Sequence, residues 1–345
     1  MMNEKQCMNK KLVEVTGLKK YYPVKSGFFS KEYGTVYAVD DVNLSIDKNE
    51  TLGLVGESGC GKSTLGKCLL RAIEPTAGSV KFNIPDGDTV ELINMDKKRM
   101  RGLRRHMQMI FQDPYSSLDP RMTIMDIISE PLILNYKMRG SELNDRVAEL
   151  MDDVGMEMKY LKRYPHAFSG GQRQRIGIAR ALAMNPTFIV ADEAVSALDV
   201  SVQAQILNLM NDLQDKYKLT YLFIAHNLSV VEHISDRVAV MYVGKMVEVC
   251  EKNELFGNPL HPYSEALLSA MPIPDPTRRK DRIHLPGEVA SAAALPTGCY
   301  FHPRCSYCKE ECKQDSPTLR EVKPGHFVAC HRAEEISLRG IKEYK

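Results

Sequence analysis

The sequence lacks any apolar stretch that approaches the roughly 18 residues needed to cross a bilayer. Its amino terminus, MMNEKQCMNKK, lacks the apolar core of a signal peptide. It also lacks an excess of charge of one sign, because 46 basic side chains stand against 44 acidic ones and the net charge is +2. These absences argue against a membrane-spanning protein, a secreted protein, and a protein held to nucleic acid by its overall charge. We therefore expect the chain to be made and kept in the cytosol.

The composition is that of an ordinary globular protein of about two domains. Of the 345 residues, 43% are hydrophobic and 26% are charged, which is ample for a core. One basic cluster, residues 97–105, has no aromatic side chains interleaved with it, so it is interpreted as a solvated face. Prolines crowd the segment from Pro259 to Pro296, and five of the nine cysteines follow Pro296. We expect a domain boundary near residue 258 and a small cysteine-rich module after it.

A phosphate-binding loop is predicted at residues 56–64, where GESGCGKST matches the pattern G-x-x-x-x-G-K-[S/T]. Its glycines permit a bend that aims successive backbone N–H groups at phosphate oxygens. Lys62 adds positive charge for the β and γ phosphates of ATP, and the Ser63 hydroxyl is a ligand for Mg²⁺. A strand over residues 51–55 and a helix from Leu65 to Ala72 are expected to flank it. The predicted phosphate-binding residues are Gly56, Glu57, Ser58, Gly59, Cys60, Gly61, Lys62, Ser63 and Thr64.

Hydrophobic periodicity predicts an α/β fold. Apolar and polar residues alternate over 42–47, which indicates a strand of an antiparallel sheet with one buried face. Apolar residues recur at three- and four-residue steps over 147–154 and again over 202–213, which indicates helices. Compact apolar runs at 188–191 and 221–225 read as buried strands. Strands and helices that alternate in this way are typical of a parallel α/β core.

Two further segments indicate ATP hydrolysis. The strand at 188–191 ends in Asp192 and Glu193, of which the first is suited to hold Mg²⁺ and the second to polarise an attacking water. The segment Phe168-Ser169-Gly170-Gly171-Gln172 opens a predicted helix that continues through Ala183. A helix start of this kind offers free N–H groups and dipole charge to a phosphate.

With these residues in order, the chain resembles the ATP-binding cassette family, whose signature is usually Leu-Ser-Gly-Gly-Gln. The resemblance covers roughly residues 10–257. It implies a P-loop ATPase fold with a RecA-like core, an antiparallel β subdomain and a helical subdomain inserted at about residues 113–185. Cassettes of this family pair head to tail, so the resemblance implies that the signature contacts ATP held by the partner's loop. The signature residues here are Ser169, Gly170, Gly171 and Gln172.

The same resemblance assigns roles to four single residues. Gln112 is similar to the glutamine that joins the metal site to the helical subdomain, and it is expected to help Ser63 and Asp192 with Mg²⁺. Asp199 lies in Ser196-Ala197-Leu198-Asp199, which resembles the dimer-contacting loop. His226 is similar to the switch histidine that touches the γ phosphate. Tyr22 matches the aromatic residue on which adenine stacks, and the adjacent Tyr21 competes for that assignment.

Longer segments narrow the family. The runs GESGCGKSTLGKCLL, FQDPYSSLDPRMTI and SALDVSVQAQIL look like those of the F subunits of oligopeptide and dipeptide permeases. Residues 258–263 resemble the start of the extension of these ATPases, which we expect to span 258–345. Two residues depart from the pattern: Ala194 replaces a common proline, and Asn49 replaces a common glycine. Because asparagine tolerates left-handed backbone, Asn49 is expected to keep the same turn.

The cysteines of the extension are the more open part of the sequence. Cys299, Cys305, Cys312 and Cys330 are spaced as in the permease ATPases that hold a [4Fe–4S] cluster. Four thiolates also bind zinc, and Cys308 adds a Cys-x-x-Cys spacing that zinc sites favour, with His331 as a spare ligand. The sequence leaves iron–sulfur, zinc and no metal as alternatives.

Together these features predict a peripheral ATPase subunit on the cytoplasmic face of the cell membrane that powers import of dipeptides or oligopeptides. The expected partners are a second cassette chain of the D type or a second copy, two integral membrane permease subunits and, indirectly, an extracellular peptide-binding protein. Glu193, His226, Lys62 and Gln112 are the expected catalytic residues. The rivals are a soluble cassette ATPase that acts on nucleic acid or the ribosome, and an ATPase gated by a metal cluster.

Overall fold

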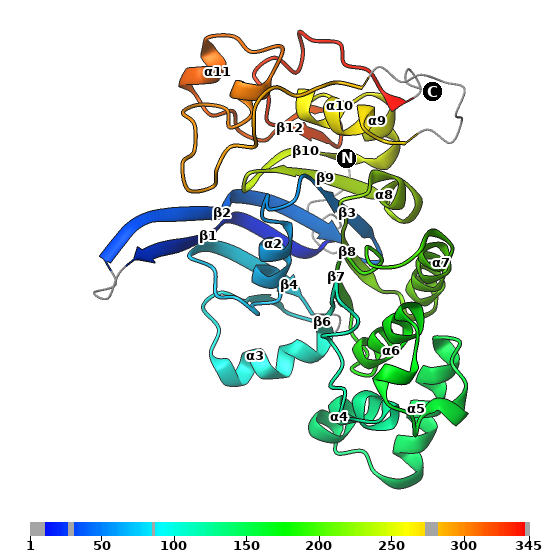
Figure 1. The fold of residues 1–345 in the computed structure, drawn as a ribbon. Coiled ribbons are helices and arrows are strands. Elements are labelled where there is room, and N and C mark those ends of the chain that lie inside the picture. Colours follow the sequence, from blue (N-terminus) through cyan, green and yellow to red (C-terminus); the bar gives the residue numbers. More distant parts are fainter. Residues whose placement is uncertain (1–10, 27–30, 85–86, 273–281, 342–345) are drawn as a thin grey trace.

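Two sheets and the helices around them form the body of the protein (Figure 1). The computed structural model describes residues 11–26, 31–84, 87–272 and 282–341, so part of the proline-rich segment and the predicted start of the cassette at residue 10 lie outside it. The smaller sheet has the order β2-β1-β4-β5, and its strands are β1 (Lys11–Ser26), β2 (Lys31–Asp47), β4 (Ala77–Asn83) and β5 (Thr89–Glu91).

The smaller sheet is antiparallel throughout, as the alternation over residues 42–47 predicts. Val13 pairs with Ile46 and Val15 pairs with Leu44, and all four side chains are buried. Because successive strand residues point to opposite faces, this register places every apolar member of the pattern on one side. In Figure 1, β1 and β2 extend well beyond the rest of the sheet as a two-stranded ribbon.

The larger sheet has eight strands in the order β11-β12-β10-β9-β3-β8-β7-β6. Its middle is parallel, with β3 paired to β8 and β9, and β7 paired to β6 and β8. Every residue of β3, β7 and β8 is buried, which is typical of parallel strands covered on both faces. The strands are β3 (Thr51–Val55), β6 (Met107–Ile110), β7 (Phe188–Asp192), β8 (Thr220–Ile224), β9 (Arg237–Tyr242), β10 (Lys245–Glu251), β11 (Arg320–Lys323) and β12 (His326–Val328).

The helices fall into three groups in Figure 1. The first group lies beside the sheets, the second forms an arm that projects at the lower right, and the third belongs to the carboxyl-terminal part at the top. The groups are α2 (Lys62–Leu69), α3 (Lys97–Leu103), α7 (Val200–Tyr217) and α8 (Leu228–Ile234); then α4 (Ile124–Tyr136), α5 (Gly140–Asp153) and α6 (Gly170–Leu182); then α9 (Lys252–Gly257), α10 (Pro262–Ser269) and α11 (Glu311–Gln314).

Helix α2 ends earlier than the sequence predicts. The expected helix runs to Ala72, whereas α2 ends at Leu69 and Arg71 adopts a left-handed φ of 47°. The Arg71 guanidinium donates to the carbonyl oxygen of Leu92 at 2.8 Å and to the Glu74 carboxylate at 2.9 Å. These contacts hold the Arg71 side chain against Glu74 and against Leu92 in the connection after β5. The left-handed turn at Arg71 ends the helix where these contacts are made.

The arm packs around the apolar face predicted for residues 147–154. Val147, Leu150 and Met151 in α5 are completely buried, and Gly155 follows with a left-handed φ of 64°. Helices α4, α5 and α6 contact one another along this face. The arm therefore has its own apolar interior, while α6 also contacts β6 and α7 of the core.

The carboxyl-terminal part is joined to the cassette through the larger sheet. Strand β12 pairs antiparallel with β10, with Glu248 opposite Val328. The buried Glu248 carboxylate accepts N–H groups of Leu260 at 2.6 Å and His261 at 3.1 Å, and His326 Nε2 lies 2.7 Å from it. Since an unpaired buried charge is costly, these contacts bind the two parts together.

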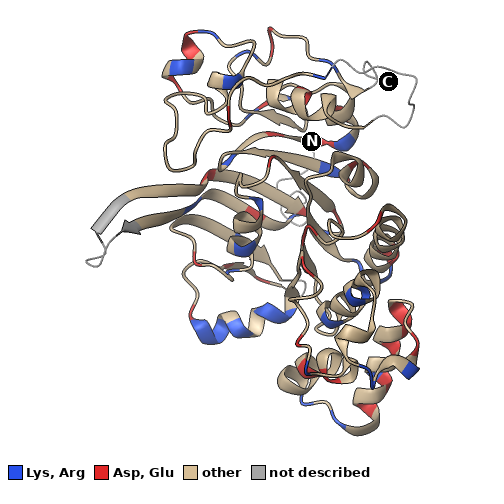
Figure 2. Ribbon diagram, viewed as in Figure 1, with Lys and Arg blue, Asp and Glu red and all other residues tan. Residues whose placement is uncertain are grey.

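The charged surface agrees with the sequence in one respect. Helix α3 carries the basic cluster and is blue along most of its length in Figure 2, and its lysine and arginine side chains are exposed. Over the described ranges, no helix combines the length and the apolar character needed to cross a membrane.

Candidate functional site

The loop of residues 56–61 connects β3 to α2 and bends sharply between them. Gly56 has a φ of 152° and Gly61 a φ of 107°. A Cβ atom at Gly56 would lie 2.1 Å from the carbonyl oxygen of Met241, and one at Gly61 would lie 2.0 Å from that of Ala38. Only glycine fits at either position, so the backbone itself forms the wall of the loop.

Charge and hydroxyl groups converge just after this bend. The Lys62 ammonium is buried and donates to the carbonyl oxygens of Gly56 at 2.8 Å and Glu57 at 2.9 Å. The Ser63 hydroxyl donates to Asp192 Oδ1 at 2.6 Å. A pocket of about 410 Å³ opens here, and it is lined by Val36, Ala38, Ser58, Gly59, Gly61, Lys62, Ser63, Thr64, Gln112, Glu193, His226 and Ala292.

The two adjacent carboxylates at the end of β7 have different environments. Asp192 is buried beside Ser63, and burial raises the pKa of its carboxyl. Glu193 has a left-handed φ of 48° and lines the pocket, where its Oε2 accepts from Gln112 Nε2 at 2.7 Å. His226 Nδ1 lies 3.4 Å from the same oxygen. An uncommon backbone conformation of this kind is often found at a functional residue.

The oxygen donors at Ser63 and Asp192 fit a magnesium ion. The hydroxyl, which lines the pocket, and the buried carboxylate behind it lie 2.6 Å apart, and Mg²⁺ prefers oxygen ligands of this kind together with water and phosphate oxygens. Gln112 reaches the same region from the end of β6, with its amide nitrogen turned to Glu193. The structure therefore brings together the predicted residues of the hydrolytic site from four separate segments.

The two tyrosines near the end of β1 point to different partners. The Tyr21 hydroxyl donates to Asp40 Oδ1 at 2.6 Å, and its ring meets Tyr37 edge-on at 4.7 Å between ring centres. Tyr22 instead lies close to the Thr64 side chain of the phosphate loop, and burial raises the pKa of its phenol. Neither ring is among the described residues that line the pocket. Val36, Ala38 and Ala292 also line the pocket, and no motif in the sequence indicates that they do.

The signature segment begins helix α6. The Ser169 hydroxyl accepts the Gln172 N–H at 3.3 Å, and the Gln172 side chain accepts the Ser169 N–H at 3.1 Å, so the two residues form a capping box. A Cβ atom at Gly171 would lie 2.4 Å from Val202 Cγ1, so glycine permits α6 to lie against α7. Among the described residues, no member of the signature lines the pocket at the phosphate loop.

The loop before α7 presents polar and apolar groups together. The Asp199 carboxylate caps α7 by accepting the Val202 N–H at 3.0 Å and the Ser201 hydroxyl at 2.7 Å. The next residue, Val200, has an exposed fraction of 82%. A single exposed apolar side chain is ordinary at a protein surface, so Val200 alone does not mark a contact surface.

Four of the five cysteines in the extension surround one small cavity. Its volume is about 20 Å³, and its walls include Cys299, Cys305, Cys312 and Cys330. Burial raises the pKa of Cys299 to about 11 and that of Cys305 to about 12, and neighbouring thiols add to both shifts. Among the described residues, no three of these sulfur atoms lie within 4.8 Å of one another.

The additional ligand candidates turn elsewhere. Cys308 does not line the cavity, and its thiol donates to the carbonyl oxygen of Lys309 at 3.4 Å. His331 borders the cavity, but its Nε2 lies 2.9 Å from the carbonyl oxygen of Asp315. The Cys-x-x-Cys spacing thus places only Cys305 at the cavity.

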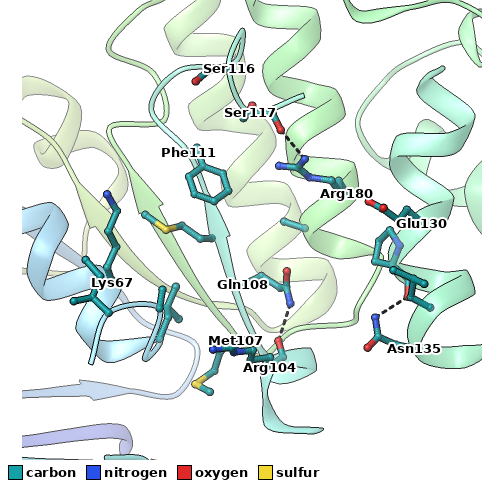
Figure 3. A pocket seen from close by; sticks show the side chains of 17 residues that line it. Lys67, Arg104, Met107, Gln108, Phe111, Ser116, Ser117, Glu130, Asn135 and Arg180 are labelled. Carbon is teal, nitrogen blue, oxygen red and sulfur yellow. Dashed lines mark hydrogen bonds between the residues drawn. The ribbon is translucent and has the colours of Figure 1, made fainter. Parts of the chain in front are cut away.

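A larger groove of about 760 Å³ lies between the core and the arm (Figure 3). Phe111, the residue before Gln112, points into it and has an exposed fraction of 43%, and Leu134 of α4 is 62% exposed. Arg180 donates to the carbonyl oxygen of Ser117 at 2.7 Å across one wall. The groove combines exposed apolar side chains with a charged rim, and it adjoins the hydrolytic site through β6.

Comparisons with known proteins agree with this geometry. The ABC transporter family model matches residues 39–196, and the model of the oligopeptide/dipeptide transporter C-terminal region matches residues 247–312. The oligopeptide transport ATP-binding protein AppF of Bacillus subtilis is 52% identical over 93% of this chain and 97% of its own length. The dipeptide transport ATP-binding protein DppF of Haemophilus influenzae is 48% identical over 93% of this chain and 97% of its own. The dimeric structure of the bacterial ABC transporter cassette MJ0796 matches with a TM-score of 0.61 at 29% identity, over 70% of this chain and 99% of that one.

Proposed function

The chain belongs to the ABC transporter ATP-binding family, and we propose that it is the ATP-hydrolysing subunit of an importer of dipeptides or oligopeptides. One observation carries the proposal: the oligopeptide/dipeptide transporter region at residues 247–312 follows a complete cassette in the same chain. Relatives that match over nearly their full length are named as oligopeptide and dipeptide transport ATP-binding proteins. We propose that residues 10–257 form the cassette and residues 258–345 form the extension.

We propose that Glu193 is the base that orients the attacking water and accepts its proton. Its carboxylate lies within hydrogen-bond distance of Gln112, which fixes its direction, and beside His226. Lys62 and His226 then stabilise negative charge that develops on the transferring phosphoryl group. Ser63 and Asp192, with help from Gln112, would hold Mg²⁺, which supplies charge neutralisation at the phosphates when bound.

We propose that the active form is a head-to-tail pair of cassettes. The signature residues and the phosphate loop do not share a pocket within the chain, which supports an arrangement in which each completes the site of the other. The exposed Val200 beside Asp199 lies where a second cassette would be contacted. A matching solved cassette is itself described as dimeric. The second cassette is a D-type chain or another copy.

We further propose that the groove of Figure 3 receives a short helix of a permease subunit, so that the protein sits on the cytoplasmic face of the membrane. The groove has a volume of about 760 Å³ and exposed apolar side chains at Phe111 and Leu134, which supports the entry of a helix with these two residues as contacts. Phe111 precedes Gln112 in the chain, and Gln112 bonds Glu193. Movement of the permease helix is thereby coupled to the hydrolytic residues.

The four cysteines around the cavity are proposed to hold a metal centre, with a [4Fe–4S] cluster as the expected occupant and zinc as the alternative. Four thiols around one cavity are a suitable donor set for either. A Zn–S bond of about 2.3 Å places tetrahedral sulfurs about 3.8 Å apart, closer than they lie here. A cluster needs more room than a cavity of about 20 Å³ provides, so these side chains would have to turn outward to hold one.

Copurification tests the transport proposal. The tagged chain, solubilised with detergent from cells that produce its neighbouring subunits, is expected to recover integral membrane proteins. Phe111→Asp and Leu134→Asp should abolish that recovery, because each places a charge in the groove. Val289→Asp replaces an exposed apolar residue of the extension and serves as the matched control that keeps the partners.

The rival class gives a different result in the same experiment. Recovery of ribosomes or nucleic acid without membrane proteins would overturn the transport proposal. Recovery of membrane proteins that is insensitive to both groove variants would keep the importer but remove the groove as its docking site.

A further inference from the structure

A side chain of the cysteine module reaches the phosphate loop. Arg304, in the 3-10 turn η4 (His302–Arg304), lies between Cys299 and Cys305 in sequence. Its Nη1 donates to Glu57 Oε2 at 2.8 Å and its Nη2 donates to Glu57 Oε1 at 3.2 Å. Glu57 is the second residue of the loop. The pair is bidentate, a geometry that fixes orientation as well as distance.

Glu57 is also held through its backbone. Its N–H donates to the Tyr263 hydroxyl at 2.8 Å, and its carbonyl oxygen accepts from the Lys62 ammonium at 2.9 Å. Tyr263 belongs to α10 and packs against Tyr242 and Phe301 at 4.7 and 5.4 Å between ring centres. The residue that supports Lys62 is therefore fixed from the extension at both its side chain and its N–H group.

The carboxyl-terminal part makes further contacts close to the nucleotide pocket. The Tyr300 hydroxyl donates to Asp40 Oδ2 at 2.8 Å, and Asp40 also accepts from Tyr21. The carbonyl oxygen of Ala292 accepts the Tyr37 N–H at 2.9 Å, and Ala292 lines the nucleotide pocket. Tyr300 beside Cys299 and Arg304 beside Cys305 thus each contact a residue that lies within two positions of one lining the pocket.

We propose that Arg304 is a positioning residue that acts on the phosphate loop through Glu57. It thereby makes ATP affinity depend on the cysteine module. The inference rests on the proposed function only in taking ATP as the occupant of the loop. Arg304 itself does not line the pocket among the residues described there, so it does not touch the nucleotide.

Two physical effects follow from the pair. The bidentate contact with Arg304 holds Glu57 in the position that it has in the bent loop before nucleotide binds. The carbonyl oxygen of Glu57, which accepts from Lys62, is held with it. Arg304 also neutralises a carboxylate one residue from Ser58, which lines the pocket. Without Arg304, that carboxylate stands uncompensated near a polyanionic ligand, and binding weakens by charge repulsion.

The test is a double-mutant cycle on the full-length chain, with MgATP affinity measured by calorimetry in the Glu193→Gln background, which prevents turnover. The pair is partly buried, with exposed fractions of 9% and 28%. The free-energy cost of losing it should therefore lie between the cost for a surface ion pair and the cost for a buried one. Arg304→Met should raise the Kd about tenfold. Arg304→Lys keeps the charge but loses the bidentate contact, so its Kd should lie between those of the parent and Arg304→Met.

The second arm of the cycle distinguishes action through Glu57 from direct attraction. In a Glu57→Gln background, where the bidentate pair is already lost, Arg304→Met should change the Kd by less than about threefold. If Arg304 attracted ATP by its own charge, it would still raise the Kd about tenfold in that background, and the proposal would be overturned. Arg320→Met removes an exposed arginine that pairs with Glu334 in the same module, and it should leave the Kd unchanged.

Stability and metal content are measured on the same samples. Arg304→Met is expected to keep the fold and the cysteine-bound metal of the parent, with a melting temperature lowered by no more than a few degrees, because one partly buried ion pair is lost. Equal affinity of Arg304→Met and the parent overturns the inference while the parent still binds MgATP. A parent that fails to bind MgATP instead refutes the proposed function.

Discussion

Glu193→Gln is expected to lower ATP turnover at least about 100-fold and to leave MgATP binding intact. The glutamine has the same shape, and its amide oxygen still accepts from Gln112, which lies 2.7 Å away in the wild type. His226 Nδ1, 3.4 Å from the same carboxylate oxygen in the wild type, stays beside that amide oxygen. The substitution therefore keeps the shape of the site and removes the negative charge and the ability to take a proton. Loss of a general base corresponds to about 2.7 kcal/mol or more in the barrier.

The assay is phosphate release by the reconstituted cassette pair at saturating MgATP, with binding measured separately by calorimetry. Glu310→Gln makes the same chemical change on an exposed side chain that pairs only with Lys313, and it should leave turnover unchanged. Turnover within threefold of the wild type in Glu193→Gln would refute the assignment of the base. A loss of binding that equals the loss of turnover would show that Glu193 holds the nucleotide instead.

Three further predictions concern other parts of the chain. Gly171→Ala should lower the free energy of unfolding by about 1 to 3 kcal/mol, because its Cβ would lie 2.4 Å from Val202 Cγ1. Adding Val202→Ala should restore that free energy, as measured by urea melts. A double variant no more stable than the single one contradicts this packing. Burial lowers the pKa of His261 to about 3, so the unfolded chain takes up a proton below about pH 6.5 that the folded chain refuses, and stability is lost as the pH falls. His261→Asn keeps an acceptor at the helix start and should reduce that loss by about 2 kcal/mol between pH 7 and pH 5 in urea titrations, whereas an unchanged pH dependence would show that His261 is protonated when folded. Protein purified anaerobically should be brown, with visible absorption that Cys312→Ser abolishes and Cys308→Ser retains, whereas colourless protein with stoichiometric zinc contradicts the iron–sulfur assignment.

The sequence was most informative where one short segment carries its own physical signal. The strand before the phosphate loop, β3, has the predicted bounds, and β7 and β8 lie within one residue of theirs. Asn49 has the left-handed φ of 60° expected for a replacement of glycine in a turn. In each case the cause is local, either the burial of a short apolar run or the backbone preference of one residue.

Contacts between distant segments were not predictable in this way. Nothing near Arg304 in the sequence indicates that its partner is Glu57, 247 residues earlier. The pairing of β12 with β10 has no local signal either, because both strands are short and their partners are set by packing. The same reason explains Cys308, where local spacing favoured a ligand and the turn of the chain directs the thiol away from the cavity.

The buried Glu248 has a consequence for the order in which the protein is synthesised. All three groups that it contacts lie after it in the chain, and the last of them, His326, follows 78 residues later. Until the ribosome has made almost the whole polypeptide, this carboxylate lacks its His326 partner and the edge of β10 stays open. A nascent cassette released early by premature termination would therefore expose a strand edge with an acidic group facing the interior, which makes it a substrate for chaperones or proteases before it can compete for a place in the transporter.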